Sequence, residues 1–196
     1  MIRGRHQLVA AAITTLQTHL QLTIMQAARD FGWDTDDADV ARLLTIKGWR
    51  QPSTREMFDP AIPLIVTTSS GWVGDPEIEG DGTVSAVYDL IVNPVVRGAD
   101  FEQTADVISI VAAGVRTCLE QHRSLGVGWV SDLAVVSEFF DELEADKQRV
   151  LAEALITFHV AVCSIHDRND RPDPDGGWTD APTVLTTDVS LDHLEE

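Results

Sequence analysis

The sequence predicts an α+β domain, a two-layer sandwich in which helices cover one face of a mainly antiparallel four-stranded sheet. Two observations support this prediction. Apolar residues recur every three or four positions in two long segments, and four runs rich in β-branched and aromatic residues separate or follow them. The expected order is helix, strand, strand, helix, strand, strand, or α-β-β-α-β-β, which fits two hairpins backed by helices.

Two amphipathic helices are expected. The first carries an apolar stripe of Leu8, Ala12, Leu16, Leu20, Ile24, Ala27 and Phe31, and Gly32 ends it. The second begins after Asp100, whose carboxylate can cap it, with Gln103 placed as in a capping box. Its apolar stripe comprises Phe101, Ala105, Ile108, Val111, Ala112, Val115 and Leu119.

Four strands are expected in two pairs, from the runs "PLIVTTS" and "TVSAVYDLIV", and "WVSDLAVVSEFF" and "RVLAEALITFHVAVCSIHD". The segment 71–82 between the first two is rich in glycine and acids, so we expect a long solvated loop that is either mobile or a contact element. The acidic "DELEADKQ" is expected to form the second hairpin loop.

One domain is expected over residues 1–167, followed by an acidic extended tail over 168–196 that becomes ordered only against a partner. Within the domain, residues 33–59 are expected to form an irregular insertion, to which "DTDDADVARLL" adds a helical turn or two.

The charge is strongly negative: 32 acidic and 14 basic residues give −18. This balance argues against stable DNA binding, which depends on Lys and Arg, and predicts repulsion from anionic membranes. No run reaches the roughly 20 apolar residues that a membrane span needs, and "LVAAAITTL" lacks the cleavage site of a signal peptide. The two cysteines, Cys118 and Cys163, lie in apolar segments, which indicates a reducing cytoplasm rather than a disulfide framework.

Several clusters were weighed as catalytic or metal sites. Cys118 and His122 are four residues apart on the second helix, but packing for the cysteine and an end-of-helix role for the histidine explain them better. Arg116 and Arg123 lie in the same last turns, and Gly126 is expected to cap the helix. His159, Cys163 and His166 are spaced too widely along a strand to share one zinc ion.

Two acidic clusters lack the full pattern of a calcium loop, and we interpret the first as a solvated loop and the second as a helix start. One comprises Asp75, Glu77, Glu79 and Asp81, and the other Asp34, Asp36, Asp37 and Asp39. None of the common nucleotide-binding, hydrolase or metalloprotease motifs is present in the sequence, so we expect a protein that is not an enzyme and uses no cofactor or metal.

Isolated apolar and basic residues are instead candidates for protein contacts. The candidates in the 71–82 segment are Trp72, Val73, Asp75, Glu77 and Ile78, and Trp178 is the candidate in the tail. A basic segment adds Arg42, Lys47, Arg50 and Arg55, which could meet an acidic surface on a neighbouring chain or form an ordinary polar loop.

Three local features, "VYDLIVNPVVRG", "QHRSLGVGWV" and "ALITFHVAV", together with the order of elements, give a resemblance over residues 4–167. In these features the chain resembles the tail terminator proteins of long-tailed bacteriophages. The resemblance implies a small α+β subunit of a hexameric ring that caps the tail tube, stops its polymerisation and joins the tail to the head-side connector or stopper protein. It implies no enzyme and no cofactor, and a location in the tail or neck of the virion after assembly in the host cytoplasm. DNA would pass through the ring without stable binding.

Residues 33–59 and 168–196 exceed what a minimal terminator needs. Three alternatives stay open: another neck component such as a head completion or stopper protein, a small metal-dependent hydrolase using His122 or His159, and a host-directed inhibitor that mimics nucleic acid through its acidity.

Overall fold

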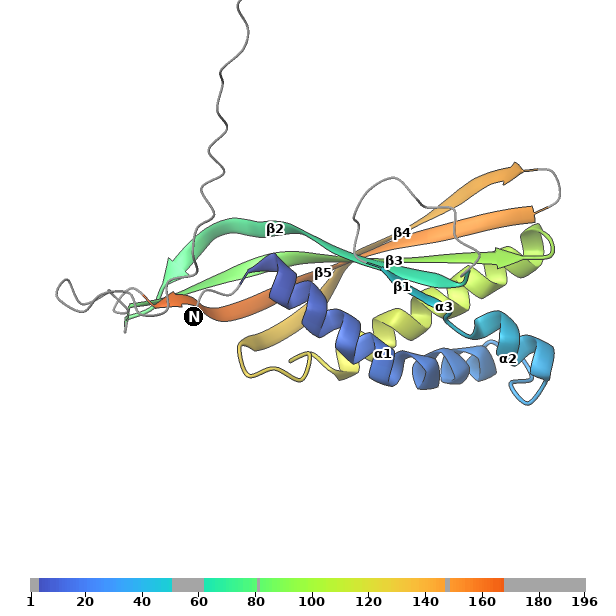
Figure 1. Ribbon diagram of the computed structural model, residues 1–196, viewed down its shortest axis with the longest axis horizontal. Helices are drawn as coiled ribbons and strands as arrows, with labels where there is room; N and C mark the ends of the chain where they lie inside the picture. Colours follow the sequence, from blue (N-terminus) through green and yellow to red (C-terminus); the bar gives the residue numbers. More distant parts are fainter. Residues whose placement is uncertain (1–3, 51–61, 81, 147–148, 168–196) are drawn as a thin grey trace, which may run out of the picture.

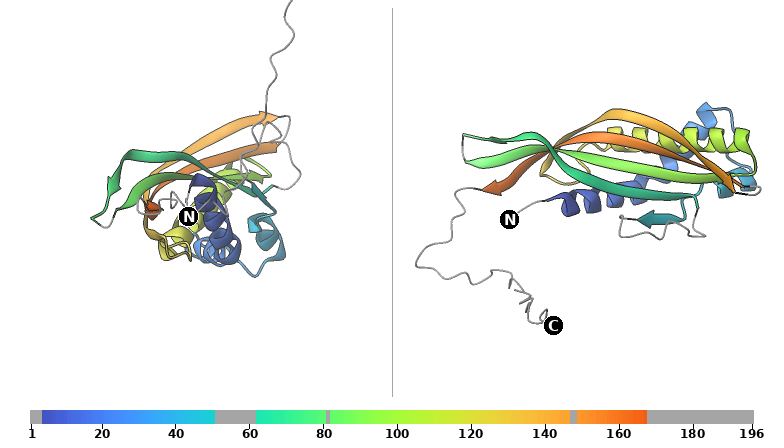
Figure 2. Two further views of the ribbon diagram at one scale, coloured as in Figure 1. Left: turned by 60° about the vertical axis from the view of Figure 1, so that its left-hand side comes forward. Right: turned by 90° about the horizontal axis from the view of Figure 1, so that it is seen from above.

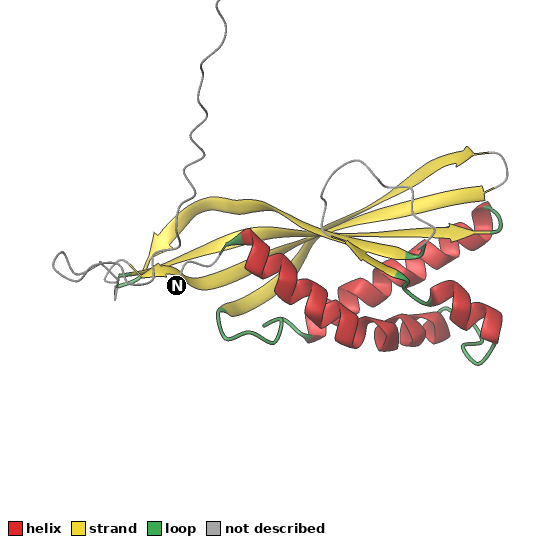
Figure 3. Ribbon diagram, viewed as in Figure 1, coloured by secondary structure: helices red, strands yellow, loops and turns green. Residues whose placement is uncertain are grey.

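The computed structural model describes residues 4–50, 62–80, 82–146 and 149–167. It is a mixed α+β structure in which three helices lie on one side of a five-stranded sheet (Figures 1 and 3). The elements in chain order are α1 (Arg5–Asp30), α2 (Ala38–Leu44), β1 (Gly48–Arg50), β2 (Leu64–Ile78), β3 (Thr83–Gly98), α3 (Phe101–Gln121), β4 (Val130–Asp146) and β5 (Arg149–Asp167).

The sheet has the strand order β1-β2-β3-β5-β4. The prediction of four strands was therefore wrong. The additional strand, β1, pairs in parallel with the start of β2, through Gly48 with Leu64 and Arg50 with Val66, so the sheet is mixed. All other neighbours are antiparallel. Figure 2 shows the twist that the long central strands give the sheet.

The segment 71–82 is not the long loop that its composition predicted. β2 continues through it to Ile78, and only a tight turn remains, in which the Glu79 N–H donates to the Thr83 carbonyl over 2.8 Å. Two register shifts, after Thr68 and after Val73, accommodate the glycines and Pro76 within the strand. Pairing with β3 thus outweighs the local preference of these residues for a turn.

Two other expected loops are also more regular than predicted. The 141–148 segment belongs largely to strands, since β4 runs to Asp146 and β5 begins at Arg149. Residues 33–59 contain α2, capped by the Asp37 carboxylate, and β1, so that segment is not simply irregular; residues 51–61 lie outside the described part.

The two long helices form as predicted. In α3 the Asp100 carboxylate accepts from the Gln103 N–H over 2.8 Å, as in the predicted cap. Phe101 and Ala105 face solvent, however, as does Phe31 just after α1, so the buried stripes are shorter at these ends than the periodicity indicated. By length and by a mean hydropathy of 1.3, α1 could also cross a bilayer. Here its stripe of Leu8, Leu16, Leu20 and Ile24 is fully or almost fully buried in the core.

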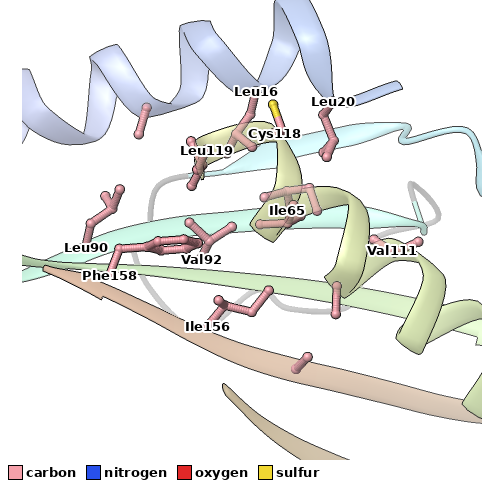
Figure 4. Close-up of a cluster of buried hydrophobic side chains, with 14 of the residues drawn as sticks. Leu16, Leu20, Ile65, Leu90, Val92, Val111, Cys118, Leu119, Ile156 and Phe158 are labelled. Carbon is pink, nitrogen blue, oxygen red and sulfur yellow. The ribbon is translucent and has the colours of Figure 1, made fainter. Parts of the chain in front are cut away.

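One core joins the helices to the sheet (Figure 4). Leu16 and Leu20 of α1 and Leu119 of α3 meet Phe158 and Ile65 of the sheet. Helices α1 and α3 pack closely at Gly114, where an added Cβ would lie 2.6 Å from Cγ1 of Ile24 and 2.9 Å from its Cα. The buried Thr23 hydroxyl donates to the Gly114 carbonyl over 2.8 Å at this crossing.

Candidate assembly surfaces

The face of the sheet opposite the helices carries polar pairs. Asp89 of β3 accepts a hydrogen bond from Ser70 of β2 at 3.0 Å and lies 3.3 Å from His159 Nε2 of β5. The Asn93 amide of β3 donates to Glu153 of β5 over 3.1 Å. Such pairs across strands hold the register and keep this face polar.

The candidate contact residues of the 71–82 segment lie on the second half of β2. Trp72 is 55% exposed, although its ring meets Tyr88 edge to face with the ring centres 6.1 Å apart. Val73 and Ile78 are exposed as well. In this half, β2 has β3 on one side and no described strand on the other, because β1 reaches only to Val66. These apolar groups therefore line a free sheet edge rather than a loop.

A shallow pocket of about 380 Å³ lies beside this edge. Val73, Val87 and Cys163 contribute apolar walls, and the carboxylates of Asp75 and Glu77 supply negative charge. Among the described residues, no group of three His, Cys, Asp or Glu side chains could hold a metal ion.

The opposite edge of the sheet is β4, and the sequence analysis did not identify it as a contact surface. Val136 is 51% exposed, Phe139 62% and Phe140 45%. Consecutive residues of a strand point to opposite faces, so Phe139 and Phe140 place an aromatic ring on each side of this edge. The pair "FF" within an acidic stretch was the available signal, because large aromatics among charges are unusual on an ordinary surface.

The basic candidates are brought together only in part. Arg42 of α2 and Lys47 line a pocket of about 480 Å³ together with Arg97 of β3 and Gln103 of α3. The backbone of Arg50 pairs with β2, while its side chain, Arg55 and Trp178 lie outside the described part. We refer to this cavity as the basic pocket. Arg97 was not predicted as part of this site, because it lies near the end of β3, far along the chain from Arg42 and Lys47.

Arg116 and Arg123, which were expected in the last turns of α3, form ion pairs with β4 residues. The helix ends at Gln121, and Arg116 forms a 2.7 Å ion pair with Glu138 of β4. Arg123 lies beyond the helix, 3.5 Å from Asp132. Gly126, with a φ of +68°, lies in the following turn rather than at the cap.

The two rings of His122 and His19 stack with their centres 3.9 Å apart. Burial and then the charge of His19 lower the pKa of His122. His122 is nevertheless the C-cap residue of α3, as its expected end-of-helix role requires, and its backbone N–H donates to the carbonyls of Cys118 and Leu119 over 3.2 and 3.1 Å. The lowered pKa disfavours the imidazolium that a further interaction with the helix dipole would require.

Cys118 is fully buried, as expected for a packing residue. Burial raises the pKa of its thiol to about 11, with a smaller opposing effect of a hydrogen bond to the Thr23 side chain. A thiol with this pKa is a poor nucleophile at neutral pH. His159 pairs with Asp89 instead of approaching Cys163 as a metal ligand would, and the side chain of His166 lies outside the described part.

No protein-family model matches the sequence, and no curated protein matches it. Among solved structures, the fold is similar to a chain of a particle described as "Virion of native gene transfer agent (GTA) particle". The two chains are 16% identical, and the match covers 76% of this chain and 97% of that chain with a TM-score of 0.43.

Proposed function

We propose that the chain is a structural subunit of a phage-like virion, and more specifically a tail terminator. In this role it caps the tail tube as a hexameric ring, stops tube polymerisation and joins the tail to the head-side connector. The proposal combines the resemblance in "VYDLIVNPVVRG", "QHRSLGVGWV" and "ALITFHVAV" with the surfaces of the fold.

The observation that carries the proposal is the β4 edge. A strand edge presents unsatisfied N–H and C=O groups, which natural proteins normally cover or protect. β4 combines such an edge with the exposed side chains of Val136, Phe139 and Phe140. Large aromatic groups of this kind dominate binding energy when a partner buries them. An edge with this composition supports a subunit that is completed by its neighbours.

A closed ring needs a heterologous contact, in which one surface of each subunit meets a different surface of the next. The sheet offers two such surfaces, because its other edge, along the second half of β2, exposes Trp72, Val73 and Ile78. We propose that β4 of one subunit faces the β2 edge of the next. Six such contacts would then close the ring around a channel.

The charge of −18 suits a ring that surrounds DNA. Acidic groups along a channel repel phosphates, so DNA would pass without stable binding. The partners in this proposal are copies of the same chain, the tail tube protein and the connector or stopper protein, without cofactors.

The test uses the purified full-length chain, alone and with isolated tail tubes. Native mass spectrometry should give a hexamer, and negative-stain electron microscopy should show rings and tubes with one ring at a single end. Tubes mixed with the protein should stop growing when more tube subunit is added. A chain that stays monomeric alone and in the presence of tubes would refute the proposal. Rings that bind connectors but leave tube growth unchanged would refute the terminator role and identify a stopper.

A further inference from the structure

The basic pocket is lined by residues of α2 and of the end of β3. These parts of the chain lie at the end of the sheet remote from the β2–β3 turn (Figure 1). Three of its lining residues are cationic, namely Arg42, Lys47 and Arg97, and Gln103 adds an amide. Asp39 is the one acidic residue among its described lining residues. Its volume of about 480 Å³ is large enough for several side chains of an inserted segment.

Arg97 distinguishes this pocket from an ordinary patch of surface charge. Its Nε is buried and has no hydrogen-bond partner among the described residues. A buried donor without an acceptor destabilises a fold, and it does so more strongly when the group is charged. The guanidinium fork matches a carboxylate, which can accept two hydrogen bonds from it. Within the described part of the chain, the Nε of Arg97 therefore has no anionic acceptor.

The acid that the pocket contains does not supply this acceptor. Asp39 lies 3.0 Å from Arg42, and both side chains are more than three-quarters exposed, so this pair contributes little. Within the described ranges, no carboxylate forms an ion pair with Lys47 or Arg97. Among its described lining residues, the uncompensated charge of the pocket is positive.

The chain has an acidic segment of suitable length. Residues 168–196 contain eight acids and two arginines. They follow Asp167, which pairs with Thr83 at the far end of β3. The 14 residues from Thr83 to Arg97 span roughly 46 Å at about 3.3 Å per residue, whereas 29 residues can extend to about 95 Å. The segment can reach the pocket of its own chain.

We propose that residues 168–196 bind in the basic pocket of the same chain, where one of their carboxylates accepts from Arg97 and a second lies beside Lys47. Attachment to the same chain gives an effective concentration on the order of millimolar, which favours this occupant over an acidic segment from another molecule. The contact is independent of ring formation.

Zero-length cross-linking tests this contact directly, because a carbodiimide joins an amine to a carboxylate only where the two touch. The chain has two lysines, Lys47 and Lys147, so the products are simple to assign by mass spectrometry. We expect Lys47 to be joined to an acid within 168–196 in the full-length chain. Mixing ¹⁵N-labelled and unlabelled chains separates links within one chain from links between chains.

Two variants of the full-length chain complete the test. Arg97→Gln should reduce the Lys47 link at least about five-fold, because it removes the charged fork, and 0.5 M salt should reduce it similarly. Arg29→Gln is the control. It changes an exposed arginine of α1 that donates a hydrogen bond to the Thr35 hydroxyl, and it should leave the yield of the Lys47 link unchanged. The proposal is overturned if Lys47 forms no link to 168–196, if the links join only different chains, or if Arg97→Gln leaves the yield unchanged.

Discussion

The two edges of the sheet are built differently. The second half of β2 carries Pro76, two glycines with positive φ at Gly71 and Gly74, and two register shifts. Proline lacks the N–H that edge pairing requires, and bulges twist an edge away from a flat partner. β4 has three register shifts but neither glycine nor proline, and it exposes two adjacent phenylalanines.

This difference separates an edge protected against indiscriminate pairing from an edge open to a partner. Natural sheets use proline, charges and bulges to prevent aggregation. β2 has all three, so its contacts depend on side chains such as Trp72. β4 has acidic residues and register shifts too, but it has no proline, so each of its residues keeps a backbone N–H. We therefore expect β4 to contribute more than β2 to assembly.

The largest effect should come from charging the β4 edge. The double variant Val136→Lys/Phe139→Lys should weaken ring formation at least about 100-fold, because it buries two amines in the contact. The monomer should unfold within about 0.5 kcal/mol of the original chain, since both side chains are exposed. Mass photometry across a concentration series measures ring formation, and urea unfolding measures the free energy of unfolding.

The matched control is Leu22→Lys, which charges a 74% exposed leucine on α1 away from both edges. Rings that form equally well in the β4 variant and in this control would remove β4 from the interface.

A change in the core should affect both edges alike. Gly114→Ala should lower the free energy of unfolding by about 1–3 kcal/mol, because its Cβ would clash with Ile24. The clash should outweigh the roughly 1 kcal/mol that alanine gains over glycine in a helix. Ser109→Ala, at a half-buried position of the same helix, is the control and should be close to neutral. Among the chains that remain folded, Gly114→Ala should form rings as well as the original chain does. A free energy of unfolding equal to that of the original chain would contradict the close crossing of the two helices.

Trp72→Ala tests the β2 edge. It should weaken assembly by about ten-fold, less than the β4 variant does, because the protected edge contributes mainly this side chain. Loss of the contact with Tyr88 should lower the free energy of unfolding by about 0.5–1.5 kcal/mol. Mass photometry measures the change in assembly of this variant, and urea unfolding measures the change in its free energy of unfolding. A larger loss of assembly than in the β4 variant would reverse the ranking of the edges.

Restoring a backbone N–H to β2 should have a smaller effect, and it should increase association between chains rather than weaken it. Pro76→Ala should raise slow aggregation, followed by light scattering over days, because it removes one protection of the edge. Ring formation should be unaffected. If Pro76→Ala scatters no more light than the original chain, then the bulges and acids suffice to protect this edge.

The smallest effect concerns a site on neither edge. His122 has a lowered pKa in the folded chain, so the unfolded chain binds more protons between this pKa and the ordinary value of about 6.5. The free energy of unfolding should therefore be fully retained above about pH 6.5 and fall as the pH drops through the lowered pKa of His122. His122→Asn should flatten this dependence in urea titrations at several pH values. An equally steep dependence in the variant would assign it to other groups.

The sequence predicted those elements whose signals are local. The periodicity of Leu8, Leu16 and Ile24 and the cap at Asp100 identified α1 and α3, because helix hydrogen bonds and caps join residues close in sequence. The second half of β2 was missed because Gly71, Gly74 and Pro76 are typical of turns, and only β3 supplies the pairing that keeps them extended. β1 was missed for the same reason, since three residues hold their place through β2 alone.

The contact surfaces were predictable only where one segment supplies them. Trp72, Val73 and Ile78 were identified as exposed anchors, although on a loop rather than a strand. The basic pocket unites Lys47, Arg97 and Gln103, whose proximity depends on the packing of α2 and α3 beside the sheet. The exposure of Phe139 depends on β4 being the last strand, a fact of strand order that no local pattern contains.

The long pairing of β3 with β5 has a mechanical consequence. Their register runs without a shift from Ala86 with Val162 to Gly98 with Val150. Hydrogen bonds between antiparallel strands stand perpendicular to the strands, so a pull along the sheet loads them in shear and they resist together. A pull across the sheet would instead open them one after another. The centre of this fold is therefore stiffest along the direction of these two strands, and a load applied in that direction would be shared by all the hydrogen bonds between them.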